Sequence, residues 1–191
     1  MKGVKKMNNA RNVSTGKPQI QGAIFSAPIG TELPKDAKTK LNETFKCLGY
    51  VSDDGIKNDN SPSTDDIKAW GGNTVLTLQK EKPDKFKYTL IEALNIDVLK
   101  AVYGADNVSG DLDTGITVKA NNSERDYNSW VIEMIMSEGI LKRIVIPNAK
   151  VSDVGEITYK DDDAIGYEIT LNASPDEAGN THYEYIVKNE A

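Results

Sequence analysis

The chain has little of the chemistry on which enzymes and metal proteins depend. Its 191 residues include one cysteine, Cys47, and one histidine, His182. A single cysteine excludes an intramolecular disulfide and a cysteine cluster for zinc. No apolar run approaches the roughly 20 residues that a membrane helix needs, and the basic start lacks the apolar centre of a signal peptide. We therefore expect a soluble protein with no membrane contact, made in a reducing, intracellular compartment.

Catalytic and ligand-binding motifs are equally scarce. The sequence has no Gly-x-Ser-x-Gly elbow, His-Glu-x-x-His helix or phosphate-binding Gly-Lys-Ser loop. Asp161 and Asp163 begin a calcium-loop pattern, but Ile165 stands at the fifth-ligand position and Asn172 at that of the bidentate glutamate. A lone histidine in a predicted strand, as His182 is, usually has a structural role. The sequence predicts a protein that is not an enzyme and has no catalytic site, metal or cofactor.

Charge is distributed unevenly along the chain. Five of the 23 basic residues precede the first acid, Glu32, so the remaining 18 stand against all 29 acids and the rest of the chain carries about −11. An acidic body repels phosphate and is a poor candidate for holding nucleic acid tightly. The basic start is open to two interpretations, a solvated tail or an arm that orders against an acidic neighbour.

The stretch 67–104 combines strand and turn patterns. Phe86, Tyr88 and Leu90 alternate with polar residues, the period of two that places one face of a strand on a core. Residues 73–79 read as the partner strand. The intervening residues 81–84 contain Pro and Asp, which favour a tight turn. The pattern therefore predicts a hairpin.

A short helix should follow this hairpin. Asn95 is an N-cap candidate, and Val98, Leu99 and Val102 form one apolar stripe. Gly104 can end the helix in the left-handed conformation. The apolar stripe predicts that the helix packs on a sheet.

Short strands with turn residues between them fill much of the rest of the chain. We expect the strand 129–136 to be buried on both faces, because it has little polar surface on either side. We expect Pro147 to end the strand 140–146. This spacing predicts a mainly β fold, a β-sandwich or small barrel of about seven to eight strands with one short flanking α-helix. The strands expected besides the hairpin are 45–51, 115–120, 129–136, 140–146, 151–159, 165–173 and 183–187.

Two further segments are open to more than one interpretation. Residues 1–20 are expected to form a flexible N-terminal arm and 21–191 a single β domain. Within that domain the long polar loop 52–66 is either a functional, partner-ordered segment or surface disorder. Trp70, followed by Gly71 and Gly72, is either an interface anchor or a core residue at a corner.

Several segments together resemble the major tail tube proteins of long-tailed siphophages of Gram-positive bacteria. They are GYVSDDGI from Gly49, SPSTDDIKAWGG from Ser61, TLIEALNIDVLKAVYG from Thr89, and the ending ITYKDDDAIGYEITLNASPDEAGNTHYEYI from Ile157. The resemblance extends over about 12–186. It implies a non-enzymatic β-sandwich that forms hexameric rings, which stack into a hollow tube for genome delivery.

The resemblance also implies partners and a location. The partners are further copies of the chain, the tape measure, tail terminator and distal tail proteins, and genomic DNA that passes non-specifically through the lumen. The location is the virion tail, assembled in the host bacterial cytoplasm. The basic arm 1–17 and the loop 52–66 are then expected to bridge rings. The candidate inter-subunit contacts are Arg11, Lys17, Tyr50, Asp53, Asp54, Asp65, Asp66 and Trp70.

A carbohydrate-binding or adhesin-like β-sandwich is the alternative function. Many short strands and aromatic residues expected to be exposed, such as Trp70, Tyr127 and Trp130, are compatible with it.

Overall fold

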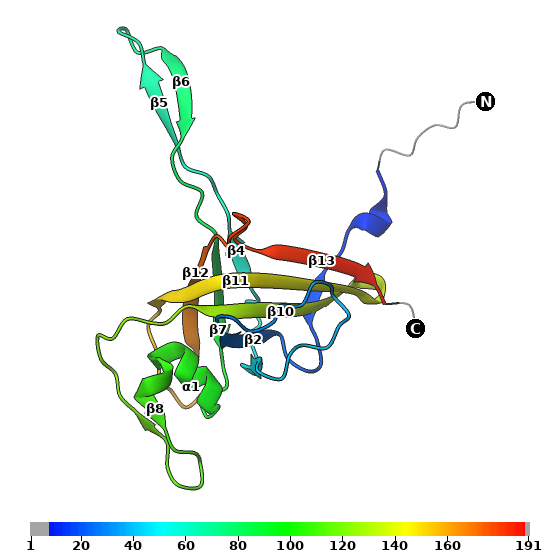
Figure 1. The fold of residues 1–191 in the computed structure, drawn as a ribbon, viewed down its shortest axis with the longest axis vertical. Helices are drawn as coiled ribbons and strands as arrows, with labels where there is room; N and C mark the ends of the chain where they lie inside the picture. Colours follow the sequence, from blue (N-terminus) through cyan, green and yellow to red (C-terminus); the bar gives the residue numbers. More distant parts are fainter. Residues whose placement is uncertain (1–7, 190–191) are drawn as a thin grey trace, which may run out of the picture.

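The fold is organised around one large antiparallel sheet. The structure is a computed structural model and describes residues 8–189 (Figure 1). In the sheet the strand order is β3-β2-β10-β11-β12-β7-β4, with β1 added to β10 and β13 added to β11. These strands are β1 (Gly16–Pro18), β2 (Ile24–Pro28), β3 (Lys46–Cys47), β4 (Lys57–Asp59), β7 (Lys85–Leu90), β10 (Asn128–Met136), β11 (Ile140–Val154), β12 (Tyr167–Ser174) and β13 (Tyr183–Lys188).

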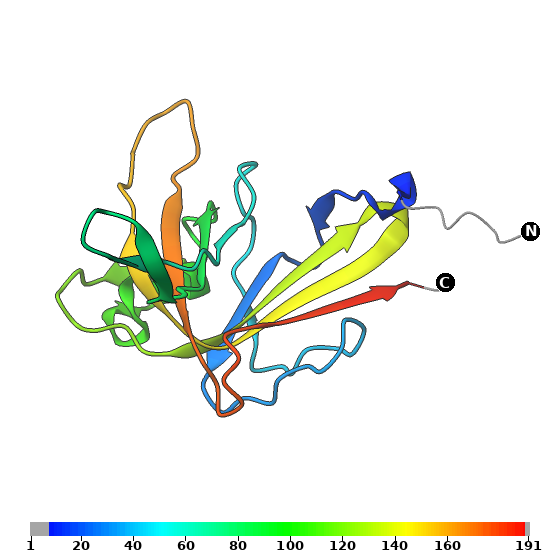
Figure 2. The same cartoon turned by 90° about the horizontal axis from the view of Figure 1, so that it is seen from above.

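Strand β11 joins two parts of this sheet. Its first half pairs with β10 on one side and with β13 on the other, whereas its second half pairs with β12. Figure 2 shows β12 at a steep angle to the β10–β11–β13 part. The prediction that Pro147 ends a strand is wrong, because β11 continues through it. Pro147 lies between the residues paired with β13 and those paired with β12, opposite a register shift in β10, where a missing N–H costs little.

The angle between the two parts encloses the main core. Trp130, Phe86, Ile132 and Leu171 are among its fully buried side chains, so the expectation that Trp130 is exposed is wrong. The prediction that 129–136 is buried on both faces is confirmed for residues 129–133 of β10, whereas 134–136 are half-buried.

The second face of β10 and β11 is covered by the segment between β2 and β3. Leu33, Leu41 and Phe45 of that segment lie in or against a small cluster that contains Val131 and Val145. Buried Arg143 fastens the same segment, because it pairs with Glu133 and donates to the carbonyl oxygens of Asp36 (2.7 Å) and Thr39 (2.9 Å).

The helix α1 (Ile96–Tyr103) forms as the sequence predicts. The Asn95 side chain accepts a hydrogen bond from the Asp97 amide, and Val98, Leu99 and Val102 are buried. Gly104 ends the helix with φ 95° and ψ 142°, so its φ is positive, as only glycine tolerates well, but its ψ is extended rather than left-handed helical. After it come the 3-10 turn η2 (Ala105–Asn107) and the small hairpin of β8 (Val108–Ser109) and β9 (Thr117–Val118). Two further 3-10 turns are η1 (Ala10–Asn12), before β1, and η3 (Ser137–Gly139), between β10 and β11.

The predicted hairpin of 73–79 with the Phe86 strand does not form. Instead β6 (Thr74–Gln79) pairs with β5 (Thr64–Lys68), and β7 pairs with β12 and β4. The turn of the observed hairpin lies at Ala69–Asn73, where Gly71 (φ +107°) and Gly72 (φ +93°) adopt conformations that L side chains rarely take. Residues 80–84 therefore connect β6 to β7 without a tight turn, although their composition suits one.

The predicted fold class is confirmed, with three local corrections. The sheet stays open within residues 8–189, since its terminal strands β3 and β4 do not pair, which removes the barrel alternative. The predicted strand 45–51 shrinks to the two residues of β3, with Val51 in a single bridge to Leu90. Residues 155–159 lie outside the strands. In the described part of the chain no helix is long and apolar enough to cross a membrane.

Candidate assembly surfaces

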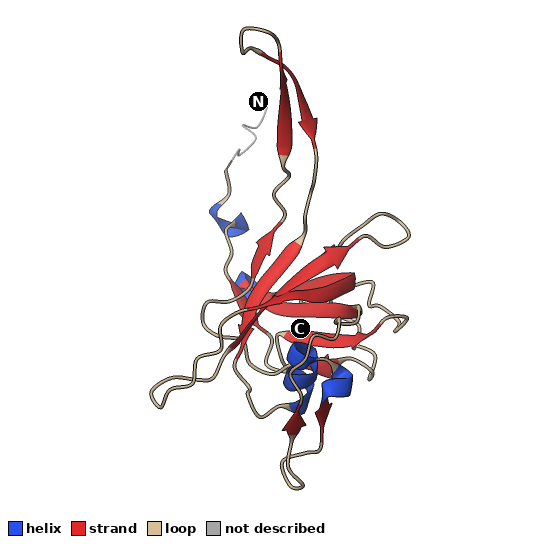
Figure 3. Cartoon of the chain, turned by 90° about the vertical axis from the view of Figure 1, so that its left-hand side faces the viewer, coloured by secondary structure: helices blue, strands red, loops and turns tan. Residues whose placement is uncertain are grey.

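A two-stranded arm extends away from the body of the molecule. We call residues 60–83, which contain β5 and β6, the arm (Figures 1 and 3). The two segments that connect β5 and β6 to the body, which we call its limbs, also stay paired. The Ser63 amide donates to the Glu81 carbonyl oxygen (2.8 Å), and the Lys80 amide donates to the Ser63 carbonyl oxygen (2.9 Å). Every residue from 61 to 82 is exposed. The arm thus has regular structure but gains almost nothing from packing against its own chain.

The arm has one polar and one apolar face. On the polar face Asp66 accepts hydrogen bonds from the hydroxyls of Thr77 (2.7 Å) and Thr74 (3.3 Å). Paired residues of an antiparallel hairpin share a face, so the register Ile67 opposite Leu76 and Asp65 opposite Leu78 places three large apolar residues on the other side.

The apolar face is open to solvent in the single chain. Ile67, Leu76 and Leu78 are each about half exposed, at 47%, 50% and 45%. An ion pair from Lys80 to Asp65 (2.6 Å) lies at the body end of the same face. An isolated hairpin is marginally stable in water, and a contiguous exposed apolar face on one marks an interaction surface.

The base of the arm is fixed by a buried carboxylate. Asp84 accepts hydrogen bonds from Asn58 (2.7 Å) and Thr181 (2.5 Å), and it contacts His182 Nδ1 at 2.5 Å. Its side chain is 1% exposed. Burial by itself raises the pKa of the Asp84 carboxyl, but the hydrogen bonds from Thr181, His182 and Asn58 outweigh burial and leave the pKa below its ordinary value. Asp84 and its three partners, which we call the clasp, therefore hold the two limbs of the arm where they leave the body.

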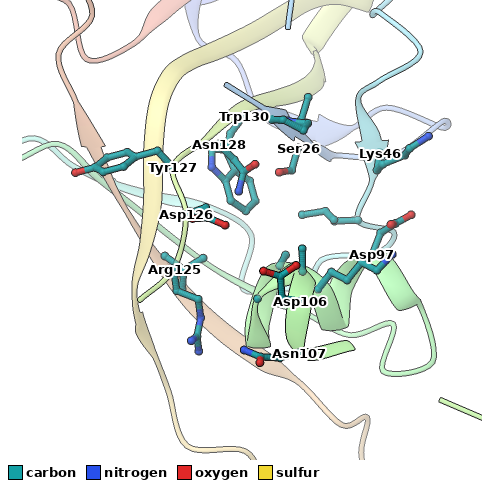
Figure 4. Close-up of a pocket in the computed structure, with 18 of the residues that line it drawn as sticks. Ser26, Lys46, Asp97, Asp106, Asn107, Arg125, Asp126, Tyr127, Asn128 and Trp130 are labelled. Carbon is teal, nitrogen blue, oxygen red and sulfur yellow. The ribbon is translucent and has the colours of Figure 1, made fainter. Parts of the chain in front are cut away.

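A cavity lies near α1. It encloses about 770 Å³ and is lined by α1, β2, β3, the start of β10 and residues 123–128 (Figure 4). Its apolar residues include Trp130, Leu48 and Ala101, and the labelled carboxylates Asp97, Asp106 and Asp126 also line it. Figures 1 and 3 show α1 and β8 at one end of the molecule and the arm at the other.

The predicted contact residues fall on three separate segments. Arg11 lies in η1 and Lys17 in β1, opposite Ile135 of β10. Tyr50, which is 73% exposed, precedes the turn that contains exposed Asp53 and Asp54. Asp65, Asp66 and Trp70 belong to the arm, with the two acids on opposite faces.

The predicted contact residues include the tip of the arm but not its apolar face. Trp70 is fully exposed at the tip, so the core interpretation of this residue is wrong. The predicted contacts do not include Ile67, Leu76 and Leu78. Residues 73–79 were expected to pair with the Phe86 strand, so the sequence pattern did not place Leu76 and Leu78 opposite residues 64–68. The signal that could have revealed the face was the glycine pair, since Gly71-Gly72 between two short β patterns marks a hairpin turn.

Comparisons with known proteins give a family and a distant structural neighbour. A family model described as phage tail tube protein matches residues 8–191. A solved structure described as the anti-feeding prophage cap (AFP tube terminating cap) is similar with a TM-score of 0.41 and 9% identity, over 88% of this chain and 91% of that one. No curated protein matches the chain.

Proposed function

Since the chain belongs to the phage tail tube protein family, and is therefore a structural component of a phage tail rather than an enzyme, we propose that it forms stacked hexameric rings. The rings make the tail tube, through which the genome is delivered. The observation that carries this proposal is the arm, a regular hairpin whose apolar face has no cover within residues 8–189. A surface of this kind suits a protein that is completed by its neighbours.

Open sheet edges support closure into rings. Among residues 8–189, strand β13 has six residues and pairs with β11 alone, so its other edge presents unpaired backbone groups, and β3 at the end of the sheet pairs only with β2. Unprotected edges of this kind pair readily with another chain. Different edges on one molecule allow head-to-tail contacts, which close into a ring when the rotation between copies permits it.

The charge of the chain supports a conduit. With Asp and Glu outnumbering Lys and Arg by 29 to 23, the wall of such a tube would attract phosphate weakly, and DNA could slide without being held. In the basic N-terminal segment Arg11 and Lys17 are exposed and would lie against acidic neighbours between rings. Residues 1–7 lie outside the described residues. The tape measure, tail terminator and distal tail proteins are the expected partners, in a virion tail assembled in the bacterial cytoplasm.

Electron microscopy of the purified full chain tests the proposal. Negative-stain images at high protein concentration, or with the tail initiator, should show tubes built of six-fold rings. Persistent single copies under all these conditions would overturn the proposal.

A shortened arm separates ring formation from stacking. Replacing residues 64–80 with Asn-Gly joins Ser63 to Glu81 through a two-residue turn and keeps Asn58 and Asp84 in place. This variant should fold and form rings, measured by circular dichroism and sedimentation, but no tubes. Normal tubes from it would show that the arm does not bridge rings.

A further inference from the structure

The arm ends in an indole that no other group covers. Trp70 is 107% exposed relative to a reference residue, and the turn that holds it is closed by bonds from Ala69 to Asn73 (2.8 Å) and from Gly72 to Ala69 (2.9 Å). A tryptophan can bury roughly 150–250 Å² in a contact and is one of the residues that most often dominate the energy of an interface. The tip therefore has the form of an anchor.

The cavity beside α1 has the form of a receptor for such an anchor. Its volume of about 770 Å³ lies in the range of pockets that enclose ligands. Its walls are stiff, because α1 is capped by Asn95 and the indole of Trp130 is fixed by its N–H bond to the Ala149 carbonyl (3.2 Å). Three carboxylates of its lining are labelled in Figure 4, those of Asp97, Asp106 and Asp126, and a carboxylate oxygen can accept a hydrogen bond from an indole N–H.

The placement of the two features identifies the occupant as a second copy. The arm tip and the α1 end lie at opposite ends of the longest axis of the molecule (Figure 1), so the tip cannot reach the cavity of its own chain. In copies displaced along that axis, the α1 end of one molecule would face the arm tip of the next. Charge agrees with this pairing, since Lys68 is the charged residue next to the tip and the lining has four acids against three bases.

We propose that Trp70 of one copy inserts into the cavity between α1, β2 and β10 of the next copy along the tube. The proposal rests on the proposed function and adds the receptor site and the anchor residue. The apolar face of the arm then lies along the neighbour, where Ile67, Leu76 and Leu78 become buried.

Photochemical crosslinking in assembled tubes tests this contact directly. The full chain carrying p-benzoylphenylalanine in place of Trp70 keeps an aromatic group at the tip, and irradiation joins it to its neighbours. Mass spectrometry should map the crosslinks to residues 97–107 and 123–130 of another copy. Tubes with crosslinks elsewhere would overturn the insertion and leave the tube proposal intact, whereas an unsubstituted chain that never assembles would overturn both.

Three variants test the energetics of the same contact. Trp70→Ala removes the anchor, and Ala105→Trp narrows the cavity at an exposed lining residue, so neither alters the core. Each should raise the protein concentration needed for tubes about tenfold or more, as loss of an interface hot spot does. Trp70→Phe, the matched control, should raise it much less. Tube formation by Ala105→Trp at the normal concentration would contradict the proposed receptor.

Discussion

The body and the arm use the same kind of apolar residue in opposite circumstances. Leu171 in β12 has no exposed surface, whereas Leu76 in β6 is half exposed, although both lie in antiparallel strands with alternating patterns. In the body a second part of the sheet covers the apolar face, and within residues 8–189 the arm has no such cover. An alternating pattern thus specifies that a face is to be covered, and leaves open which chain covers it.

Leucine-to-alanine substitutions in the body and in the arm should differ most in their effect on the stability of the monomer. Leu171→Ala leaves a cavity in the core and should lower the free energy of unfolding of the monomer by about 2–5 kcal/mol. Leu76→Ala should change it by less than about 0.5 kcal/mol, since surface changes seldom do more. Urea denaturation followed by circular dichroism measures both.

The effect on tube formation should be the opposite: among variants that still fold, the substitution in the arm should impair assembly more than the one in the body. Leu76→Ala should assemble poorly while remaining as stable as the original chain, and Thr77→Ala on the polar face is its matched control. If Leu76→Ala destabilises the monomer as much as Leu171→Ala, the arm belongs to the folding core and the contrast fails.

The clasp at the base of the arm should show an intermediate effect. Asp84→Ala leaves Asn58, Thr181 and His182 without their shared acceptor and should cost about 2 kcal/mol at neutral pH. Asp53→Ala, the same change at an exposed turn, should cost less than about 0.5 kcal/mol.

The contribution of Asp84 should depend on pH with a definite sign. The folded pKa is below its ordinary value of 3.8, so the stabilisation is complete above that value and disappears as pH falls through the lower folded pKa. Denaturation curves at pH 7 and in acid should therefore show the two chains converging in acid. A constant difference between Asp84→Ala and the original chain would show that the charge of Asp84 is unimportant.

A smaller effect is expected at a buried hydroxyl group of the body that lacks a hydrogen-bond partner. Tyr88 is buried, and its hydroxyl finds no partner among residues 8–189. Tyr88→Phe should raise the free energy of unfolding by about 1 kcal/mol, because an unsatisfied buried hydroxyl is costly.

A second tyrosine provides the opposite sign. Tyr183 donates to Asp176 (2.6 Å) and accepts from Asn180 (2.9 Å), so Tyr183→Phe should lower stability by about 1 kcal/mol. Thermal melts of both variants measure this, and a loss of stability in Tyr88→Phe would mean that its hydroxyl does find a partner.

The sequence predicted those elements whose signals are local. Asn95, with the stripe of Val98, Leu99 and Val102, specified α1 because a cap and a helical period depend only on near neighbours. The apolar run in 129–136 likewise predicted a strand covered on both faces, and that is how β10 lies.

Pairing between distant strands was beyond the sequence patterns. Residues 73–79 suit two partners equally, and two glycines rather than Pro83 set the turn. Pro147 was misread because its tolerance depends on a register shift in another strand. Of the predicted contacts, Trp70 lies fully exposed at the tip of the arm. The apolar face beside it could be recognised only once the hairpin register was known.

The route by which the arm enters the body bears on how it would carry tension. In Figure 1 the arm continues the direction of β7, and its two limbs enter the body at Asp59 and Lys85, the ends of β4 and β7. A pull along the arm would slide β7 lengthwise past β12, to which it is joined through six residue pairs. Those pairs would resist the pull together instead of opening one after another. In a tube assembled as proposed, bending or stretching would therefore strain the arms before it separated β7 from β12.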